Sequence, residues 1–319
     1  MKILVTGAAG FIGYHLCKFL LQNKVKVVGI DIIDLKKKSI FYDRLKILKK
    51  NKYFTYKKLD ISKYNALNKI FLNNKFSVVI NLAAEAGVRN SIENPEKFLN
   101  SNIIGFYNIL HLSKEYKISH LIFASSSSVY GDASEFPTSE KANISKPISF
   151  YASTKTTNEL MAFSYSQMYN LKITGLRFFT VYGPFGRPDM AIFKFFRNTI
   201  NGKKINLFNQ GQHTRDFTYV DDVITDIFSI IRERKNQTKN FNIFNIGGGS
   251  TTSLNALLRM IEKITEIKIK KNYIKKQQGD VIKTHCDNTK IIKKFRKNKY
   301  TDLYSGLVSF YEWYKQHYK

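Results

Sequence analysis

The chain of 319 residues has a formal net charge of +28 at pH 7, and 43% of its residues are hydrophobic. This length can bury a large core, and no apolar run approaches the ~18 residues that a membrane-spanning helix needs. Cys17 and Cys286 lack metal-ligand spacing, so we expect two small buried side chains and neither a metal site nor a disulfide. Met1 leads into an apolar segment without a signal peptide, which predicts a cytoplasmic protein with no membrane partner.

The basic residues raise the question of a nucleic-acid partner. Most are lysines scattered among Asn and Ile, with local runs at residues 36–38, 268–271 and 293–299. They form no aromatic-interleaved arginine stripe and match no nucleic-acid motif. We therefore predict a solvated, lysine-rich surface that binds no nucleic acid but steers anionic substrates inward.

A glycine-rich turn follows the first predicted strand. Residues 2–6 are apolar and residues 14–22 have helical periodicity, so the turn joins a strand to a helix. In that context Gly7 permits a tight turn, Gly10 lets the backbone approach a pyrophosphate, and Gly13 lets the helix pack closely on the strand. The turn predicts a dinucleotide site that includes Gly7, Gly10, Phe11, Ile12 and Gly13.

The second predicted strand, residues 25–30, ends at Asp31, eighteen residues after Gly13. A carboxylate at this place accepts hydrogen bonds from a ribose 2′-hydroxyl and repels a 2′-phosphate, which favours NAD over NADP. The alternative is that Asp31 only caps a helix.

Strands and helices continue to alternate. We predict strands at residues 53–59, 77–81, 121–124 and 172–177, and helices at residues 65–72, 95–116 and 151–169. This alternation predicts an α/β fold with a doubly wound parallel sheet, a Rossmann fold, which binds ligands at the carboxyl ends of its strands. The residues expected there beside the cofactor are Asp60, Ile61, Leu82, Ala83 and Ala84, and Ser125 falls at another strand end. The small residues among them leave room for a cofactor, or their size only reflects packing.

The predicted elements become shorter after residue 177. They are helices at residues 190–200, 223–232, 254–262 and 303–318, and strands at residues 204–207, 216–219 and 241–245. We interpret residues 1–177 as the cofactor-binding domain and residues 178–319 mainly as a smaller C-terminal α/β lobe for the substrate. Some segments of this lobe are expected to return to the sheet.

Tyr151 and Lys155 begin a predicted helix and lie on one face of it, four residues apart. A tyrosine pKa of about 10 is too high for a good base near neutrality, and a neighbouring ammonium lowers it. Ser126, at the end of a predicted strand, is placed to hydrogen-bond the same reacting oxygen. Together the three predict a device that moves a proton on and off an alcohol, although such a Tyr-Lys pair is also common as an ordinary surface pair.

With the glycine turn, Asn81-Leu-Ala-Ala84, Ser126 and Tyr151-x-x-x-Lys155 in this order, the chain resembles the extended short-chain dehydrogenase/reductase family over nearly all of its length. Four longer stretches of the chain resemble bacterial UDP-glucuronate 4-epimerases, which interconvert UDP-glucuronate and UDP-galacturonate. These stretches are residues 84–89, 124–131, 177–191 and 215–222. The resemblance implies a bound NAD and a UDP-sugar substrate. It also implies a homodimer that pairs the helices at residues 95–116 and 151–169, and products used in polysaccharide biosynthesis.

The resemblance implies roles for the central residues. Tyr151 would take the proton of the sugar C4 hydroxyl, Lys155 would hold the cofactor ribose and lower the tyrosine pKa, and Ser126 would orient the hydroxyl. The substrate-binding residues implied are Arg89, Ser127, Ser128, Thr180, Arg187, Arg215 and Asp280.

Two of these residues are assigned to the nucleotide. Arg215 would meet the diphosphate, because its planar fork donates hydrogen bonds in pairs, unless it instead pairs with Asp216 or Asp221. Asp280 would lie near the uridine ribose.

An epimerase for an acid sugar must clamp the carboxylate, because the 4-keto form is a β-keto acid that loses carbon dioxide easily. Ser127, Ser128 and Thr180 offer neutral hydroxyl donors, and Arg187 offers charge or orders its loop. Alternatively, the hydroxyls only satisfy backbone groups at strand ends. Glu85 departs from the glutamine or histidine of related sequences, and a carboxylate there would repel an anionic sugar.

Four other functions remain open. A neutral hexose or N-acetylhexosamine 4-epimerase is the nearest alternative. A 4,6-dehydratase needs an acid and a base, and a decarboxylase usually carries a Glu, where this chain has Ser127 and Ser128. A catalytically silent NAD-binding scaffold would not need Tyr151.

Overall fold

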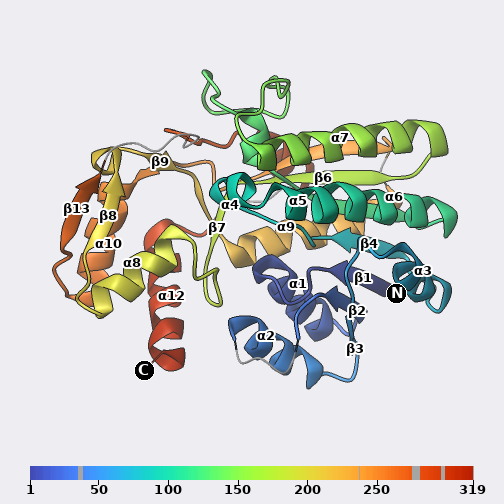
Figure 1. Cartoon of the computed structure of the whole chain (residues 1–319), viewed down its shortest axis with the longest axis horizontal. Coiled ribbons are helices and arrows are strands. Elements are labelled where there is room, and N and C mark those ends of the chain that lie inside the picture. Colours follow the sequence, from blue (N-terminus) through green and yellow to red (C-terminus); the bar gives the residue numbers. More distant parts are fainter. Residues whose placement is uncertain (35–38, 237, 275–280, 296–298, 319) are drawn as a thin grey trace. The chain divides into compact units, whose positions relative to one another are not determined.

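The structure is a computed structural model and describes residues 1–34, 39–236, 238–274, 281–295 and 299–318. Backbone contacts divide the chain into two compact units, each built from separate stretches of sequence (Figure 1). The first unit contains Met1–Gly131, Asn143–Arg177 and Ile224–Phe244, and the second contains Asp132–Ala142, Phe178–Val223 and Asn245–Lys319. The division of roles at residue 177 stays a prediction.

A seven-stranded parallel sheet with the order β11-β6-β5-β4-β1-β2-β3 contains the strands of the first unit. The strands are β1 (Lys2–Thr6), β2 (Lys26–Asp31), β3 (Phe54–Lys58), β4 (Val78–Asn81), β5 (His120–Ser126), β6 (Ile173–Phe178) and β11 (Phe241–Ile246). Every residue of β4 and of β6 is buried, as expected when helices cover both faces of a sheet. The predicted Rossmann fold is therefore confirmed, and β11 is a late segment that returns to the sheet.

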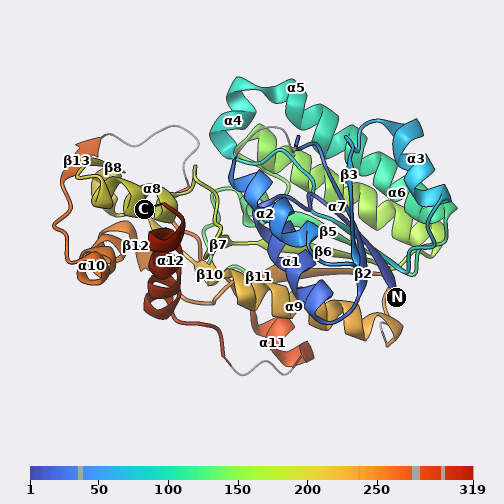
Figure 2. The same cartoon turned by 90° about the horizontal axis from the view of Figure 1, so that it is seen from below.

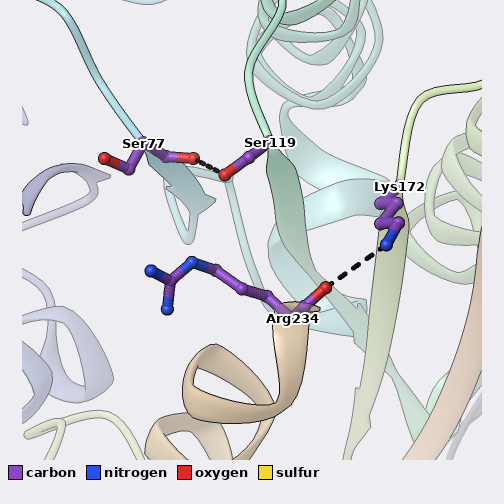
Figure 3. A pocket seen from close by; sticks show the side chains of 4 residues that line it. All are labelled: Ser77, Ser119, Lys172 and Arg234. Carbon is purple, nitrogen blue, oxygen red and sulfur yellow. Dashed lines mark hydrogen bonds between the residues drawn. The ribbon is translucent and has the colours of Figure 1, made fainter. Parts of the chain in front are cut away.

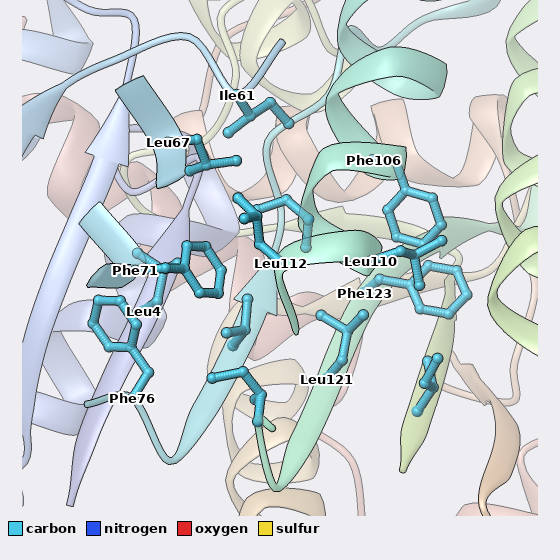
Figure 4. Packing of buried hydrophobic residues seen from close by; sticks show 14 of the residues in the cluster. Leu4, Ile61, Leu67, Phe71, Phe76, Phe106, Leu110, Leu112, Leu121 and Phe123 are labelled. Carbon is cyan, nitrogen blue, oxygen red and sulfur yellow. The ribbon is translucent and has the colours of Figure 1, made fainter. Parts of the chain in front are cut away.

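Helices cover both faces of this sheet (Figures 1 and 2). One face carries α1 (Phe11–Gln22), α2 (Ile40–Lys49) and α9 (Val220–Arg232), and the other carries α3 (Tyr64–Leu72), α6 (Gly105–Glu115) and α7 (Phe150–Tyr169). The second set packs on the sheet through a cluster of buried apolar side chains, among them Leu4, Phe71, Phe106, Leu121 and Phe123 (Figure 4).

The helix predicted at residues 95–116 contains a π-helical segment. It runs as α5 (Pro95–Phe98), a π-helix η1 (Leu99–Ile104) and α6, and a short helix α4 (Val88–Glu93) precedes it. The helices α2 and α4 and the π-helix were not predicted from the sequence. A π-helical turn inside an α-helix shifts the phase of all following side chains and is frequent at functional sites.

The second unit holds short paired strands and three longer helices. The strand pairs are β7 (Thr180–Tyr182) with β10 (Phe217–Tyr219), β9 (Thr214–Arg215) with β12 (Thr252–Ser253), and β8 (Ile205–Phe208) with β13 (Lys271–Ile274). The helices are α8 (Ala191–Ile200), α10 (Leu254–Thr265), a short α11 (Thr289–Phe295) and α12 (Leu303–His317). Aromatic side chains join α8 to α12: the Phe193 and Phe310 rings are 5.7 Å apart.

Two further expectations concern the membrane and the cysteines. Within the described ranges, no helix combines the length and apolar character that crossing a bilayer requires. Cys17 and Cys286 are buried free thiols, as predicted.

Candidate active site

The glycine turn joins β1 to α1 with no spare space. Gly7 has a φ of +69°, and a Cβ on it would lie 2.7 Å from the Ala83 nitrogen. A Cβ on Gly13 would lie 2.0 Å from the Gly7 carbonyl oxygen. Phe11 and Ile12 form the first turn of α1, so the free backbone N–H groups of the helix lie beside the turn. This cradle fits a pyrophosphate and has no room for added side chains.

Asp31 ends β2 directly beside that turn. Its Oδ2 accepts a hydrogen bond from the Ala9 nitrogen at 2.9 Å, and its Oδ1 accepts one from the Ile32 nitrogen at 2.8 Å. Burial raises the pKa of Asp31, and the backbone donors and Arg44 oppose the rise. Arg44 is fully buried and donates from Nη1 to the Ala9 carbonyl oxygen at 2.8 Å. The carboxylate is therefore held at the place where the fold puts a dinucleotide ribose, so the residues present fit NAD.

The other predicted cofactor residues lie at the carboxyl ends of neighbouring strands. Asp60 is exposed after β3, and Ile61 next to it is buried. The segment Leu82–Ala84 follows β4. There the Ala83 nitrogen donates to the Thr6 Oγ at 3.1 Å, and that hydroxyl donates to the Asn81 Oδ1 at 2.6 Å. This buried Thr-Asn pair, which the sequence reading missed, fixes the ends of β1 and β4 beside the glycine turn.

The three residues predicted to be catalytic come from β5 and the first turns of α7. Ser126 ends β5 and is buried, while Tyr151 is the second residue of α7. Lys155 is 3% exposed, and its Nζ donates to the Ala124 carbonyl oxygen at 2.9 Å, which ties α7 to β5. The same Nζ is 6.0 Å from the centre of the Tyr151 ring. Burial lowers the pKa of Lys155 to about 8, and Glu159 opposes the change.

A serine turn follows Ser126. The 3-10 helix η2 (Ser127–Tyr130) begins there, with the Ser126 Oγ accepting from the Ser128 nitrogen at 3.1 Å. The Ser126 Oγ also lies 3.1 Å from the Ser128 Oγ. Ser126 therefore caps the turn, while Ser127 and Ser128 are partly accessible.

The loop after β4 is held by Asn102, which lies in the π-helix. Its Oδ1 accepts from the Glu85 nitrogen at 2.8 Å, and its Nδ2 donates to the Glu85 carbonyl oxygen at 3.0 Å and to the Thr154 Oγ at 3.0 Å. The side chain of Glu85 is partly buried and accepts from the Asn90 Nδ2 at 3.5 Å. Arg89 lies exposed at the start of α4. Asn102 was not predicted, because it follows two other polar residues, Asn100 and Ser101, and only its burial distinguishes it from them.

Among its described residues, the second unit contains the predicted substrate residues Thr180, Arg187 and Arg215. Thr180 begins β7, and its nitrogen donates to the Asp216 carbonyl oxygen at 3.1 Å. Arg215 donates from Nη1 to the carbonyl oxygens of Thr214 and Ile282, at 2.9 and 3.0 Å. The Asp216 carboxylate accepts hydrogen bonds from the backbone nitrogens of Gly248, Gly249 and Cys286, which stabilise its buried charge.

The remaining predicted residues are Arg187 and Asp280. The Arg187 guanidinium makes a two-pronged ion pair with Asp189, at 3.1 and 2.6 Å. This pair supports the expectation that Arg187 orders its own loop. Asp280 lies outside the described residues.

A cavity of about 450 Å³ is lined by Ser77, Ser119, Lys172 and Arg234 (Figure 3). The first three directly precede β4, β5 and β6, so the cavity lies at the amino ends of the strands, opposite the glycine turn. The Ser119 hydroxyl donates to the Ser77 carbonyl oxygen, the Lys172 Nζ donates to the Arg234 carbonyl oxygen at 3.5 Å, and the Arg234 guanidinium points away from Lys172. Because the Lys172 ammonium and the Arg234 guanidinium point in different directions, this cavity is not a candidate for the reaction.

No metal site emerges from the part of the chain that the structure describes: it contains no group of three or more His, Cys, Asp or Glu side chains able to hold an ion.

Comparison with known proteins points to one group of enzymes. The family described as the NAD dependent epimerase/dehydratase family matches residues 3–247. Protein CapI of Staphylococcus aureus is 43% identical over 334 aligned residues, covering 100% of both chains. The crystal structure of UDP-glucuronic acid 4-epimerase from Bacillus cereus in complex with UDP-glucuronic acid and NAD has a TM-score of 0.91 and 35% identity over 100% of both chains. That of UDP-glucose 4-epimerase with UDP-glucose from Thermotoga maritima has a TM-score of 0.90 and 30% identity, also over 100% of both chains.

Proposed function

Because this chain belongs to the NAD dependent epimerase/dehydratase family, we propose that it is a UDP-glucuronate 4-epimerase that interconverts UDP-glucuronate and UDP-galacturonate. The observation that carries the proposal is the full-length similarity to the Bacillus cereus enzyme, together with a serine turn next to the Tyr151-Lys155 pair. NAD is the cofactor of this family, and Asp31 and the glycine turn fit it.

The chemistry divides between the cofactor and the side chains. NAD, held by the glycine turn and Asp31, would supply hydride transfer from and to the sugar. Tyr151 takes the proton from the C4 hydroxyl oxygen as the sugar becomes a ketone and gives it back when the ketone is reduced. The Lys155 ammonium favours the phenolate form of Tyr151, and Ser126 donates to the same C4 oxygen. The net result is inversion at C4 with no change in oxidation state.

The substrate must also be held at its carboxylate and its nucleotide. We assign Ser127, Ser128 and Thr180 to the carboxylate as neutral donors that supply no acid. An unclamped 4-keto acid loses carbon dioxide: the bond from C5 to the carboxyl carbon breaks, and C5 takes a proton from water. Further substrate contacts are assigned to Arg89, Arg187, Arg215 and Asp280 from the resemblance.

We further propose a homodimer. Apolar side chains on α7 and on the segment from η1 to α6 face solvent in the single chain, including Leu160, which is 63% exposed, and Phe163, which is 51% exposed. Paired with a second copy, these helices form a four-helix bundle with twofold symmetry. Light scattering should give twice the 37.0 kDa of one chain, and a 37.0 kDa particle at micromolar concentration rejects the dimer. A cytoplasmic location and a role in polysaccharide biosynthesis belong to the same proposal.

The decisive experiment gives the purified protein UDP-glucuronate, UDP-glucose and UDP-N-acetylglucosamine separately and resolves the products by chromatography. We expect UDP-galacturonate from the first. Conversion of only the neutral sugars rejects the acid-sugar assignment.

The second candidate is therefore a neutral-sugar 4-epimerase. Glu85 favours this candidate, because a carboxylate in the loop after β4 repels an anionic sugar. The similarity to the Thermotoga maritima UDP-glucose 4-epimerase favours it too. Glu85→Gln separates the two: the acid-sugar assignment expects kcat/KM for UDP-glucuronate to rise, while that for UDP-glucose changes little.

A further inference from the structure

A buried ion pair lies behind the serine turn. Arg177, near the end of β6, donates from Nε and Nη2 to the two carboxylate oxygens of Glu159, at 2.9 and 2.6 Å, and both side chains are 5% exposed. The third nitrogen, Nη1, donates to the Tyr130 hydroxyl at 2.9 Å, and the guanidinium lies 4.8 Å from the centre of that ring. The Ser125 Oγ donates to the Glu159 Oε1 at 2.5 Å.

This ion pair holds both ends of the serine turn. Ser125 directly precedes Ser126, and Tyr130 is the last residue of η2. The segment Ser126–Ser128 therefore lies between two anchors that meet at the same Arg177-Glu159 pair.

The same pair is connected to Lys155. Glu159 lies one helical turn after Lys155 on α7, and Lys155 donates to Ala124 while Glu159 accepts from Ser125. Two residues on one face of α7 thus hold two successive residues of β5. A shift of Glu159 moves the serine turn relative to Lys155.

Stability alone does not explain such a pair. Desolvation offsets most of the attraction between buried charges, and apolar residues of similar size often support a fold equally well. What apolar residues cannot supply is direction, since the planar guanidinium and the carboxylate fix four hydrogen bonds at set angles.

We propose that Glu159 and Arg177 are positioning residues that lock the Ser126–Ser128 segment against Lys155 during the reaction. The proposal rests on the function proposed above and identifies what keeps its serine turn in register. The charge of Glu159 also acts on Lys155, since it opposes the effect of burial on the Lys155 pKa. The charged side chains on the neighbouring helices α4 and α5 are exposed and screened by solvent: Arg89, Glu93, Glu96 and Lys97.

The main test variant is the double substitution Glu159→Leu with Arg177→Met, which removes both charges and keeps the volume. We expect its thermal unfolding and NAD content to stay near those of the wild type. We expect kcat for UDP-glucuronate to fall about 100-fold, because a displacement of about 1 Å has that effect on a catalytic geometry. The fraction of decarboxylated UDP-pentose product should rise, since the serines no longer hold the carboxylate.

A matched control is Thr174→Val. Thr174 lies on the same strand as Arg177, and its Oγ is 2.9 Å from the Nε2 of buried His120 on β5. This buried polar bond joins the same two strands at their amino ends, so the control loses a similar bond far from the serine turn. We expect some loss of stability, with kcat and the pentose fraction unchanged.

A readout independent of turnover follows the titration of Lys155. In protein labelled with ¹³C-lysine, the Lys155 signal is assigned by its loss in Lys155→Arg. Glu159→Gln removes the charge, so the Lys155 pKa should fall below its wild-type value of about 8, while Thr174→Val leaves it in place. Should Glu159→Gln not fold, Ser125→Ala removes one hydroxyl from the network. Loss of this single hydrogen bond is expected to lower kcat about tenfold with the fold intact.

The possible failures are distinguishable. If the wild type converts only neutral UDP-sugars, the substrate assignment fails, and the same variants test the network on UDP-glucose. If the folded double variant, or Ser125→Ala in its place, has the kcat and pentose fraction of Thr174→Val, the ion pair is only structural and the positioning role is rejected.

Discussion

Replacing Gly13 by alanine should separate cofactor binding from folding. The added Cβ would lie 2.0 Å from the Gly7 carbonyl oxygen and 2.9 Å from the Gly7 carbonyl carbon. Non-bonded heavy atoms prefer about 3.5 Å, so the start of α1 must move away from the turn by roughly 1.5 Å. Because both contacts are with backbone atoms, no side chain can rotate to relieve them.

The magnitude follows from what the displacement breaks. Overpacking of this kind costs about 1–3 kcal/mol of folding stability. The moved helix also misdirects its N–H groups away from the pyrophosphate, and one lost hydrogen bond to a charged group costs about 1.5–3 kcal/mol. NAD affinity should therefore fall roughly 10- to 100-fold. The assay is NAD per chain, released by denaturation of the purified protein, with calorimetric titration of NAD into stripped protein.

The control is Gly202→Ala. A Cβ there meets nothing within 4 Å, but the φ of +63° strains any alanine. The strain costs about 1–2 kcal/mol, similar to the loss at Gly13, with no effect expected on NAD. Equal NAD affinity in both variants would show that the turn does not bind the pyrophosphate.

Three further outcomes are expected. Tyr151→Phe should keep the fold and its NAD but lose at least about 100-fold in turnover, and near wild-type turnover would remove Tyr151 from the mechanism. Burial lowers the Lys155 pKa to about 8 from its ordinary 10.5, so kcat should fall as pH rises above about 8. The unfolded chain holds this proton up to about pH 10.5, so the stability of the wild type relative to Lys155→Met should rise from pH 8 to 10.5. A stability difference that stays constant over this range contradicts the shift. Thr180→Ala and Ser128→Ala should each raise the UDP-pentose fraction formed from UDP-glucuronate and affect UDP-glucose much less, whereas equal losses on both sugars without pentose count against the carboxylate clamp.

The elements of the sheet were predictable because their signals are local. The strand β1, the glycine turn and α1 are specified by adjacent residues, and the predicted ends of most strands are within two residues of the observed ones. The segment around Arg44 was missed because its lysines suggest a solvated loop, yet α2 buries Arg44 completely against the glycine turn. Burial of an arginine depends on its distant partners, which the sequence alone does not identify.

The candidate site divides in the same way. Tyr151, Lys155 and Ser126 were predicted because their spacing has a direct chemical meaning. Arg177 was not connected with Glu159, because the partners are eighteen residues apart and come from a strand and a helix. Its signal was a single charge in β6, a strand that is otherwise apolar or small. Strands of two residues such as β9 and β12 have no pattern of their own and form only where distant segments meet.

The path of the chain limits how this enzyme can be dissected. The backbone passes between the two compact units five times, after residues 131, 142, 177, 223 and 244. A fragment that stops at Arg177 lacks β11, so the fully buried strand β6 becomes an open edge whose unpaired N–H and C=O groups invite pairing with other chains. The fragment also lacks α9, whose Phe228 ring contacts Phe19 of α1 at 5.1 Å. Truncation should therefore yield aggregates in place of a separate cofactor-binding domain. To express either compact unit alone, its separate stretches of sequence must be joined into one chain.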